Sequence, residues 1–355
     1  MNKNILPYLL CILSCGLAGC MTMYHDSDTE DIHLGSNGLF IVNEGNFQYG
    51  NSSLSFYNPA TGSVENEIFF RANGMKLGDV AQSMTIHDNK GWIVVNNSHV
   101  IFAINTDNAL ETGRIENLTS PRYIHFVSDD KAYVTQIWDN RIFIVNPRRY
   151  EVTGYITVPG MEMENGSTEQ MTQHGQYVYC TCWSYQNRIL KIDSTTDEIV
   201  GTLTVGIQPN SITTDKYGKL WVLCDGGNED SPYGYEKASL YKIDTSDFSI
   251  EKIFYFNRKD QPSELQLNGT RDRLYWINDD IWSMDVNAST LPAACLIASR
   301  GTKYYGLTID PYTDEVYVAD AVDYQQQGVI YRYTSTGRLA DTFYAGVSPG
   351  AFCWK

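Results

Sequence analysis

The chain has 355 residues, of which 43% are hydrophobic, which is enough to bury a large core. Its 42 acidic and 26 basic residues give a formal net charge of −16 at pH 7. This charge, and the lack of any basic cluster, exclude nucleic acid and anionic phospholipid headgroups as general partners.

The first 20 residues predict a lipoprotein signal. Lys3 precedes an apolar stretch, residues 5–17, that is too short to span a bilayer as a helix. The stretch runs into LAGC, which places small residues directly before Cys20. We therefore expect removal of residues 1–19 and lipidation of Cys20, with an ordinary secretory signal as the alternative. Residues 20–37 are polar and acidic, which predicts a flexible tether.

From residue 38 onward the sequence repeats one unit seven times, with a spacing of 41 to 51 residues. Each unit contains two strands joined by a polar, Asx-rich turn, which is typical of a hairpin. The hairpins occupy residues 54–64, 101–113, 142–154, 188–200, 240–252, 281–293 and 330–342. A further strand precedes each hairpin, at residues 39–43, 92–96, 132–136, 177–181, 220–224, 274–278 and 316–320.

A fourth element comes before these three strands, as in AQSMTI (81–86) and SPRYIHF (120–126). Four strands in each period of about 40–50 residues, without helical periodicity, are the pattern of β-propeller blades. The last such element, SPGAFCW (348–354), has no strands after it, whereas the first blade lacks its inner strand. We therefore predict a seven-bladed β-propeller over residues 38–355. Its C-terminal strand completes the N-terminal blade and removes the open edge.

The two faces of such a ring receive different loops. If the strands of a blade are named A to D from the axis outward, the A–B and C–D turns share one face, and their sequences are short and generic. The B–C loops and D–A connections share the other face, and they contain many aromatic side chains. These are Phe47, Tyr49, Trp138, Trp183, Tyr185, Tyr233, Tyr235, Tyr304, Tyr305 and Tyr324.

We expect these aromatic residues to form a binding rim around one mouth of the ring. Local packing is the alternative for any one of them, but ten on one face indicate a ligand site. Hydrogen-bonding partners for the ligand come from the same loops, at Asp139, Gln186, Asn187, Asp279, Asp323 and Gln325. Because those loops contain few cations, a strongly anionic ligand is disfavoured.

Signals of catalysis and of metal binding are weak. The six histidines are scattered, and the sequence has no Gly-x-Ser-x-Gly, phosphate-binding glycine loop or His-x-x-x-His spacing. Carboxylates on the loop-rich face are ordinary strand-end residues, so we expect no enzymatic activity, catalytic cofactor or metal. The five cysteines after Cys20 are an odd number and cannot form a complete disulfide framework, although a Cys180–Cys224 bridge stays open.

The signal, the acidic tether and the segment NEGNFQYGNSSLSFY (43–57) resemble those of Bacteroidetes surface propeller lipoproteins related to the YncE-like family. Within that group the whole chain most resembles the BtuG-type cobalamin-binding proteins. The resemblance implies a lipid-anchored protein on the outside of the outer membrane. It would bind cobalamin (vitamin B12) and deliver it to a TonB-dependent outer-membrane cobalamin transporter.

Cobalamin also suits the predicted rim on physical grounds. The corrin has broad apolar faces on which aromatic rings pack, and side-chain amides that donate to carboxylates and carboxamides. Two other classes stay open: a surface glycan-binding propeller, in which the same rings stack on sugars, and a propeller glycan hydrolase or lyase, which needs a carboxylate pair or a metal cluster.

Overall fold

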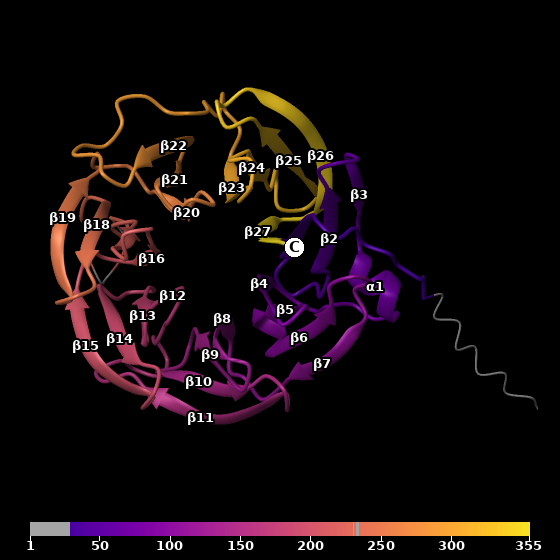
Figure 1. Cartoon of the computed structure of the whole chain (residues 1–355), viewed down its shortest axis with the longest axis horizontal. Helices are drawn as coiled ribbons and strands as arrows, with labels where there is room; N and C mark the ends of the chain where they lie inside the picture. The colour runs from indigo at the N-terminus through magenta and orange to yellow at the C-terminus, as the bar shows by residue number, and fades with distance from the viewer. Residues whose placement is uncertain (1–28, 230, 232–233) are drawn as a thin grey trace, which may run out of the picture.

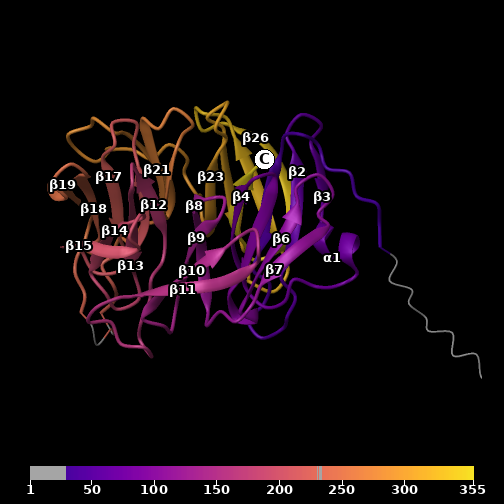
Figure 2. The same cartoon turned by 60° about the horizontal axis from the view of Figure 1, so that its bottom comes forward.

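The computed structural model describes residues 29–229, 231 and 234–355, which form seven sheets arranged in a ring around one axis (Figure 1). The predicted seven-bladed β-propeller is confirmed. Six blades have four strands and one has three. Figure 2 shows the ring from the side, with the strands running between its two faces.

The strands of each blade are given from the inner strand A outward. Blade 1 contains β27 (Pro349–Trp354), β1 (Leu39–Asn43), β2 (Ser53–Asn58) and β3 (Ser63–Glu65). Blade 2 contains β4 (Ala81–His87), β5 (Lys90–Val95), β6 (Val100–Asn105) and β7 (Glu111–Ile115). Blade 3 contains β8 (Pro121–Ser128), β9 (Lys131–Gln136), β10 (Arg141–Asn146) and β11 (Glu151–Thr157).

The other four blades follow around the ring. Blade 4 contains β12 (Met171–His174), β13 (Tyr177–Cys182), β14 (Arg188–Asp193) and β15 (Glu198–Thr204). Blade 5 contains β16 (Pro209–Thr214), β17 (Leu220–Cys224), β18 (Ser239–Asp244) and β19 (Ser249–Tyr255). Blade 6 contains β20 (Ser263–Leu267), β21 (Arg273–Asn278) and β22 (Asp280–Asp285). Blade 7 contains β23 (Tyr304–Ile309), β24 (Val316–Asp320), β25 (Gln327–Tyr333) and β26 (Leu339–Val347).

The ring is closed by pairing between the two ends of the chain. β27 lies antiparallel beside β1, with Leu39 opposite Trp354 and Ile41 opposite Phe352. The C-terminal strand is therefore the inner strand of the N-terminal blade, as the sequence predicts. This pairing satisfies the backbone groups of β1 that would otherwise form an open edge.

The hydrophobic core lies between neighbouring blades. All five residues of β1 are buried, because its sheet is covered on both faces by adjacent blades. The outer strand β15 instead alternates between exposed and half-buried residues. Trp92 of blade 2 packs in one cluster with Val134 and Phe143 of blade 3. Each blade thus depends on its neighbours for burial.

Blade 6 departs from the prediction. The repeat at 281–293 was expected to form two strands, but only β22 forms, and residues 286–303 are irregular apart from one bridge between Ile281 and Ile297. Pro292 lacks a backbone N–H and so cannot complete a ladder with β22. The outer strand predicted for this blade is therefore wrong.

Part of the segment predicted as a tether is docked on the propeller. Ile32 is buried in the core cluster of blades 1 and 2, and the Leu34 N–H donates to the Asp107 carbonyl over 2.7 Å. Glu30 forms an ion pair with Arg71 of the short helix α1 (Ile68–Asn73), at 2.6 Å. Residues 29–37 are thus part of the folded body, whereas Cys20 lies outside the described residues.

Helices are rare in the described part of the chain. Besides α1 it contains a single turn of 3₁₀-helix, η1 (Asn96–Ser98), and none of its helices is long and apolar enough to cross a membrane.

The described cysteines are not bridged. Cys180, Cys182, Cys224, Cys295 and Cys353 are free thiols, so the bridge left open between Cys180 and Cys224 is not formed.

Ring closure by β27 leads to a first prediction. Removal of residues 348–355 should abolish the cooperative thermal unfolding transition, because β1 and both blades flanking β27 then lose their burial. Circular dichroism followed with temperature measures the change. A matched control chain starting at residue 29 keeps all seven blades and should melt like the full protein. A shortened chain that melts at the same temperature as this control would contradict the closure mechanism.

Candidate functional site

The site lies on the axis of the ring, where the seven inner strands converge (Figure 1), and we call the space between them the channel. One residue from each blade, at the same position of the repeat at or just before the inner strand, lines a cavity of about 390 Å³ there. These residues are Gln82, Arg122, Glu169, Asn210, Ser263, Tyr305 and Gly350, and we call them the channel ring. From the sequence these positions are predicted only as the starts of the inner strands.

Irregular pairing near the start of the inner strands directs extra side chains to the axis. The register shifts between Ala81 and Ser83 in blade 2, and similar shifts occur in blades 3, 5, 6 and 7. Bulges of this kind place two consecutive residues against one partner and re-aim their side chains. As a result Tyr123, which follows Arg122, and Glu264, which follows Ser263, also line the cavity.

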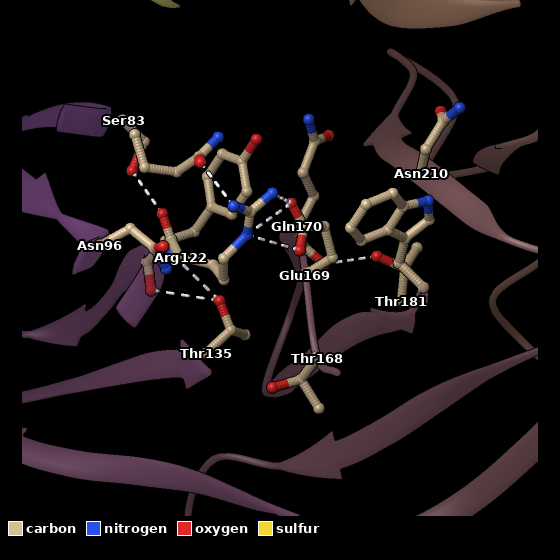
Figure 3. Close-up of polar contacts among 12 residues, drawn as sticks. Ser83, Asn96, Arg122, Thr135, Thr168, Glu169, Gln170, Thr181 and Asn210 are labelled. Carbon is tan, nitrogen blue, oxygen red and sulfur yellow. Dashed lines mark hydrogen bonds and ion pairs between the residues drawn. The ribbon is translucent and has the colours of Figure 1, made fainter. Parts of the chain in front are cut away.

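Arg122 and Glu169 form the ion pair of the channel ring (Figure 3). The guanidinium donates from Nε to both carboxylate oxygens over 3.0 and 3.1 Å and from Nη2 over 2.7 Å. Its Nη1 donates to Gln82 Oε1 over 2.5 Å. Ser83 Oγ fixes the backbone by donating to the Arg122 carbonyl over 2.7 Å. Both charges are thus largely satisfied within the protein.

Glu44 reaches the axis from the β1–β2 loop through space that a glycine leaves. A Cβ atom at Gly350 would lie 2.3 Å from Glu44 Oε1, so any side chain at 350 would displace this carboxyl group. The Tyr305 hydroxyl donates to both Glu44 oxygens over 2.9 and 3.0 Å. Burial raises the pKa of Glu44, against the lowering effect of that hydrogen bond and of the Arg122 charge.

Glu264 differs from the other channel carboxyl groups because nothing in the described part of the chain bonds to it. Its backbone is left-handed, with φ of 55°, within the irregular pairing of β20 with β21. Burial, together with the negative charges of Glu44 and Glu169, raises its pKa to about 8. Most Glu264 side chains are therefore protonated at pH 7.

The cavity lining contains four carboxyl groups and only one cationic side chain, Arg122. Asp225 is the fourth acid, and burial raises its pKa although the Gly227 N–H donates to it over 2.8 Å. No group of three or more His, Cys, Asp or Glu residues among residues 29–229, 231 and 234–355 is arranged to hold a metal ion.

Three of the predicted aromatic residues lie in the channel itself. Trp183, Tyr304 and Tyr305 line the cavity. The Trp183 indole stands 5.7 Å from the Arg122 guanidinium and directs Nε1 toward Asp225 over 3.5 Å. Tyr304 donates to or accepts from the Tyr333 hydroxyl over 2.9 Å. They form the walls of the channel, whereas the sequence placed them on the rim.

Four of the predicted aromatic residues are exposed on the loops around the channel mouth. Trp138 is 50% and Tyr324 is 49% exposed, and Phe47 and Tyr49 are more exposed still. Exposure alone does not distinguish this face, since Tyr217 and Tyr312 are exposed on A–B turns of the opposite face.

Three of the aromatic loop tips on this face have a strained backbone. Trp138, Tyr185 and Tyr324 all have left-handed backbones, with φ of 60–62°. Bulky residues rarely adopt this conformation, which favours glycine or asparagine. Tyr150 and Phe248, in C–D turns, also have left-handed backbones, but their aromatic rings pack against the neighbouring blade. Tyr150 lies over Gly113 and Phe248 lies over Gly201, where a Cβ atom would contact the aromatic ring.

Trp138 is half exposed at the tip of the β9–β10 loop. At this tip the described contact is between backbone groups, from the Trp138 N–H to the Gly166 carbonyl over 2.7 Å. Tyr324 packs edge-on against Tyr305 at 5.4 Å, which joins the rim to the channel wall. Strained backbone conformations cluster at functional sites, so these two exposed tips are candidates for ligand contact.

The polar residues predicted for the rim have mixed roles. Asp139 is completely buried and is held by Arg141 at 2.7 Å and by Thr119 at 2.6 Å. Burial raises its pKa, but the hydrogen bonds from Arg141 and Thr119 outweigh this and lower it. Asp139 therefore braces the β9–β10 loop and is not available to a ligand.

The remaining predicted residues lie at separate places on the same loops. Asn187, Asp279 and Gln325 are exposed and Gln186 is half-buried. Asp323 caps its own loop by accepting from the Gln325 N–H over 3.0 Å. Tyr235 donates to the Arg258 carbonyl and stacks with that guanidinium at 5.5 Å. Tyr233 lies outside the described residues.

Comparisons with known proteins agree with this fold. A family model described as a domain of unknown function, DUF5074, matches residues 37–342. No curated protein matches the chain.

Several solved structures are similar to the chain. A quinonprotein alcohol dehydrogenase-like protein from Bacteroides thetaiotaomicron has a TM-score of 0.66 at 13% identity, covering 89% of this chain and 77% of its own. A periplasmic gluconolactonase from Pseudomonas aeruginosa also has a TM-score of 0.66, at 11% identity, covering 90% and 98%. A Bacteroides fragilis protein provisionally described as a 6-phosphogluconolactonase has a TM-score of 0.64 at 12% identity, covering 90% and 98%. At these identities the likeness shows the fold alone.

The raised pKa of Glu264 leads to a second prediction. Because the folded protein keeps a proton that the unfolded chain releases above about pH 4.5, this residue should lower the stability progressively from pH 5 to pH 8. Glu264→Gln should remove that slope. Relative to wild type, it should gain about 2–4 kcal/mol in free energy of unfolding between pH 5 and pH 8.

Urea unfolding at the two pH values measures this change. Glu116→Gln, at an exposed acid in the connection before β8, is the matched control and should leave the slope unchanged. Parallel curves for wild type and Glu264→Gln would show that Glu264 is ionised in the folded protein.

Proposed function

This chain belongs to the DUF5074 family, and we propose that it is a cell-surface binding protein that captures cobalamin on the face bearing the aromatic rim. The observation that carries the proposal is the pair of exposed aromatic side chains, Trp138 and Tyr324, held on strained loop tips at the mouth of a polar channel. A flat, partly apolar ligand can lie across such a mouth and contact several blades at once.

The chemistry of the mouth suits a neutral ligand rich in amide groups. The channel ring contributes the carboxamides of Gln82 and Asn210, and Gln170 and Gln266 add two more. Hydrogen-bond acceptors outnumber cationic side chains in the cavity lining, which suits the amide N–H groups at the edge of a corrin. The resemblance to BtuG-type proteins supplies the specific ligand. It also supplies the proposed route, from a lipid anchor at Cys20 to a TonB-dependent transporter in the outer membrane.

The loop-tip residues provide the direct test. Trp138→Gly and Tyr324→Gly keep the left-handed backbone at lower strain, so the melting temperature should stay the same or rise. Loss of an aromatic anchor typically costs 2 kcal/mol or more, so affinity for cyanocobalamin should fall about thirtyfold. Isothermal titration calorimetry measures the affinity and circular dichroism measures the melting temperature.

Tyr312→Ala is the control, since this tyrosine is 82% exposed on the opposite face. Its affinity for cyanocobalamin should equal that of wild type. Millimolar or weaker binding by wild type would reject cobalamin as the ligand. Wild-type affinity in both glycine variants would reject the rim as its site. A panel of glycans titrated in parallel tests the glycan-binding alternative.

A propeller hydrolase is the second candidate, and one observation favours it. Burial and the neighbouring carboxylates raise the pKa of Glu264 to about 8, beside the Arg122–Glu169 ion pair, and a carboxyl group with a raised pKa suits the role of a general acid. Incubation of the protein with glucono-δ-lactone and with a glycan panel tests this function. Turnover that Glu264→Gln abolishes and Glu116→Gln retains would favour the hydrolase over the binding protein.

A further inference from the structure

The channel below the rim contains an unbalanced set of charges. Of its four carboxyl groups, Glu169 is neutralised by Arg122 and Asp225 accepts from neutral donors. Glu44 accepts only from the Tyr305 hydroxyl, and Glu264 has no partner among the residues that the structure describes. Arg122, which is already paired with Glu169, is thus the one cation in this lining for Glu44 and Glu264 as well.

The walls around these two groups are aromatic. Trp183, Tyr305, Tyr304 and Tyr123 line the same cavity as Glu44 and Glu264. Aromatic faces combined with carboxylates are the typical environment for an organic ammonium ion, because the ring quadrupole and the carboxylate both attract positive charge. A metal ion suits the cavity less well, since the described residues supply no cluster of three metal-ligating groups.

The backbone indicates that Glu264 is held in place for a purpose. Its left-handed conformation in an irregular strand costs free energy, and no hydrogen bond to the carboxyl group offsets that cost. Gly350 has a parallel role, because the absence of a side chain there lets Glu44 reach the same cavity.

We propose that the central channel is a binding site for the protonated amino group of a small organic amine, held between Glu264 and Glu44 and walled by aromatic rings. The ammonium ion supplies the positive charge that the channel lacks, and Glu264 ionises when it binds. This site is separate from the rim and does not depend on the identity of the ligand bound there.

The size of the cavity limits the ligand. About 390 Å³ accommodates a short aliphatic amine but not a macrocycle. Tyr123 and Gln170 also line a second cavity, of about 370 Å³, beside residues of the inner strands β4 and β8.

Titration of the full-length protein with n-butylamine, followed by calorimetry or ligand-observed NMR, tests the proposal. Butyramide and butyrate, of the same size but neutral and negative, are the ligand controls. We expect butylamine to bind at least tenfold more tightly than either. Because Glu264 must lose its proton, affinity should rise about tenfold or more from pH 6 to pH 8, a range in which the amine stays charged.

Three variants separate this site from its surroundings. Glu264→Gln should weaken butylamine binding at pH 8 at least tenfold and remove the dependence on pH. Glu116→Gln, with the same charge change at an exposed position, should bind like wild type. Trp138→Gly should also bind butylamine like wild type, which separates failure of the rim from failure of the channel.

Two results would overturn the proposal. One is equal binding of butylamine and butyramide, which would show that the channel does not select positive charge. The other is unchanged affinity for butylamine in Glu264→Gln, provided that this variant retains a cooperative melting transition. Gly350→Ala tests the same site through Glu44. It should weaken butylamine binding, because the added methyl group displaces the Glu44 carboxyl group.

Discussion

The structure depends on one geometric constraint, the convergence of seven inner strands on a single axis. Residues that are about 40–50 positions apart in sequence become neighbours there, so one position of the repeat supplies a complete ring of side chains. Repetition creates the ring, and differences between copies make it chemically specific. Arg122 in blade 3 meets Glu169 in blade 4, whereas blade 1 contributes Gly350 and admits Glu44 in its place.

The same constraint explains how much the sequence predicts. Seven copies of a hairpin with alternating burial, and a C-terminal strand without successors, determine the architecture, because each copy needs neighbours to bury its faces. The exposed aromatic loop tips at Trp138 and Tyr324 are also predictable, since tight turns seldom contain such residues. The channel ring was not predicted, although the sequence contains a signal for it. The residue directly after Ala81, and after its counterpart in each other blade, differs in charge and size from one blade to the next.

Other features need the three-dimensional context. The unpartnered state of Glu264 follows from a left-handed backbone in irregular pairing, and neither is encoded in composition or periodicity. Asp139 and Trp183 belong to loops of the predicted kind. Their partners, Arg141 for the first and Arg122 with Asp225 for the second, decide that one is structural and the other lines the channel. The docking of Ile32 against blades 1 and 2 likewise depends on a groove between blades.

Pairing of β1 with β27 also sets the order of events when the protein is made. Leu39 and Trp354 are more than 300 residues apart, so the first blade to emerge from the ribosome is the last to be completed. Until then β1 presents an unpaired, largely apolar edge, and such edges favour aggregation. A contact of this sequence separation also slows folding. Closure therefore waits for the complete chain, which makes the interval before it the most vulnerable period of folding.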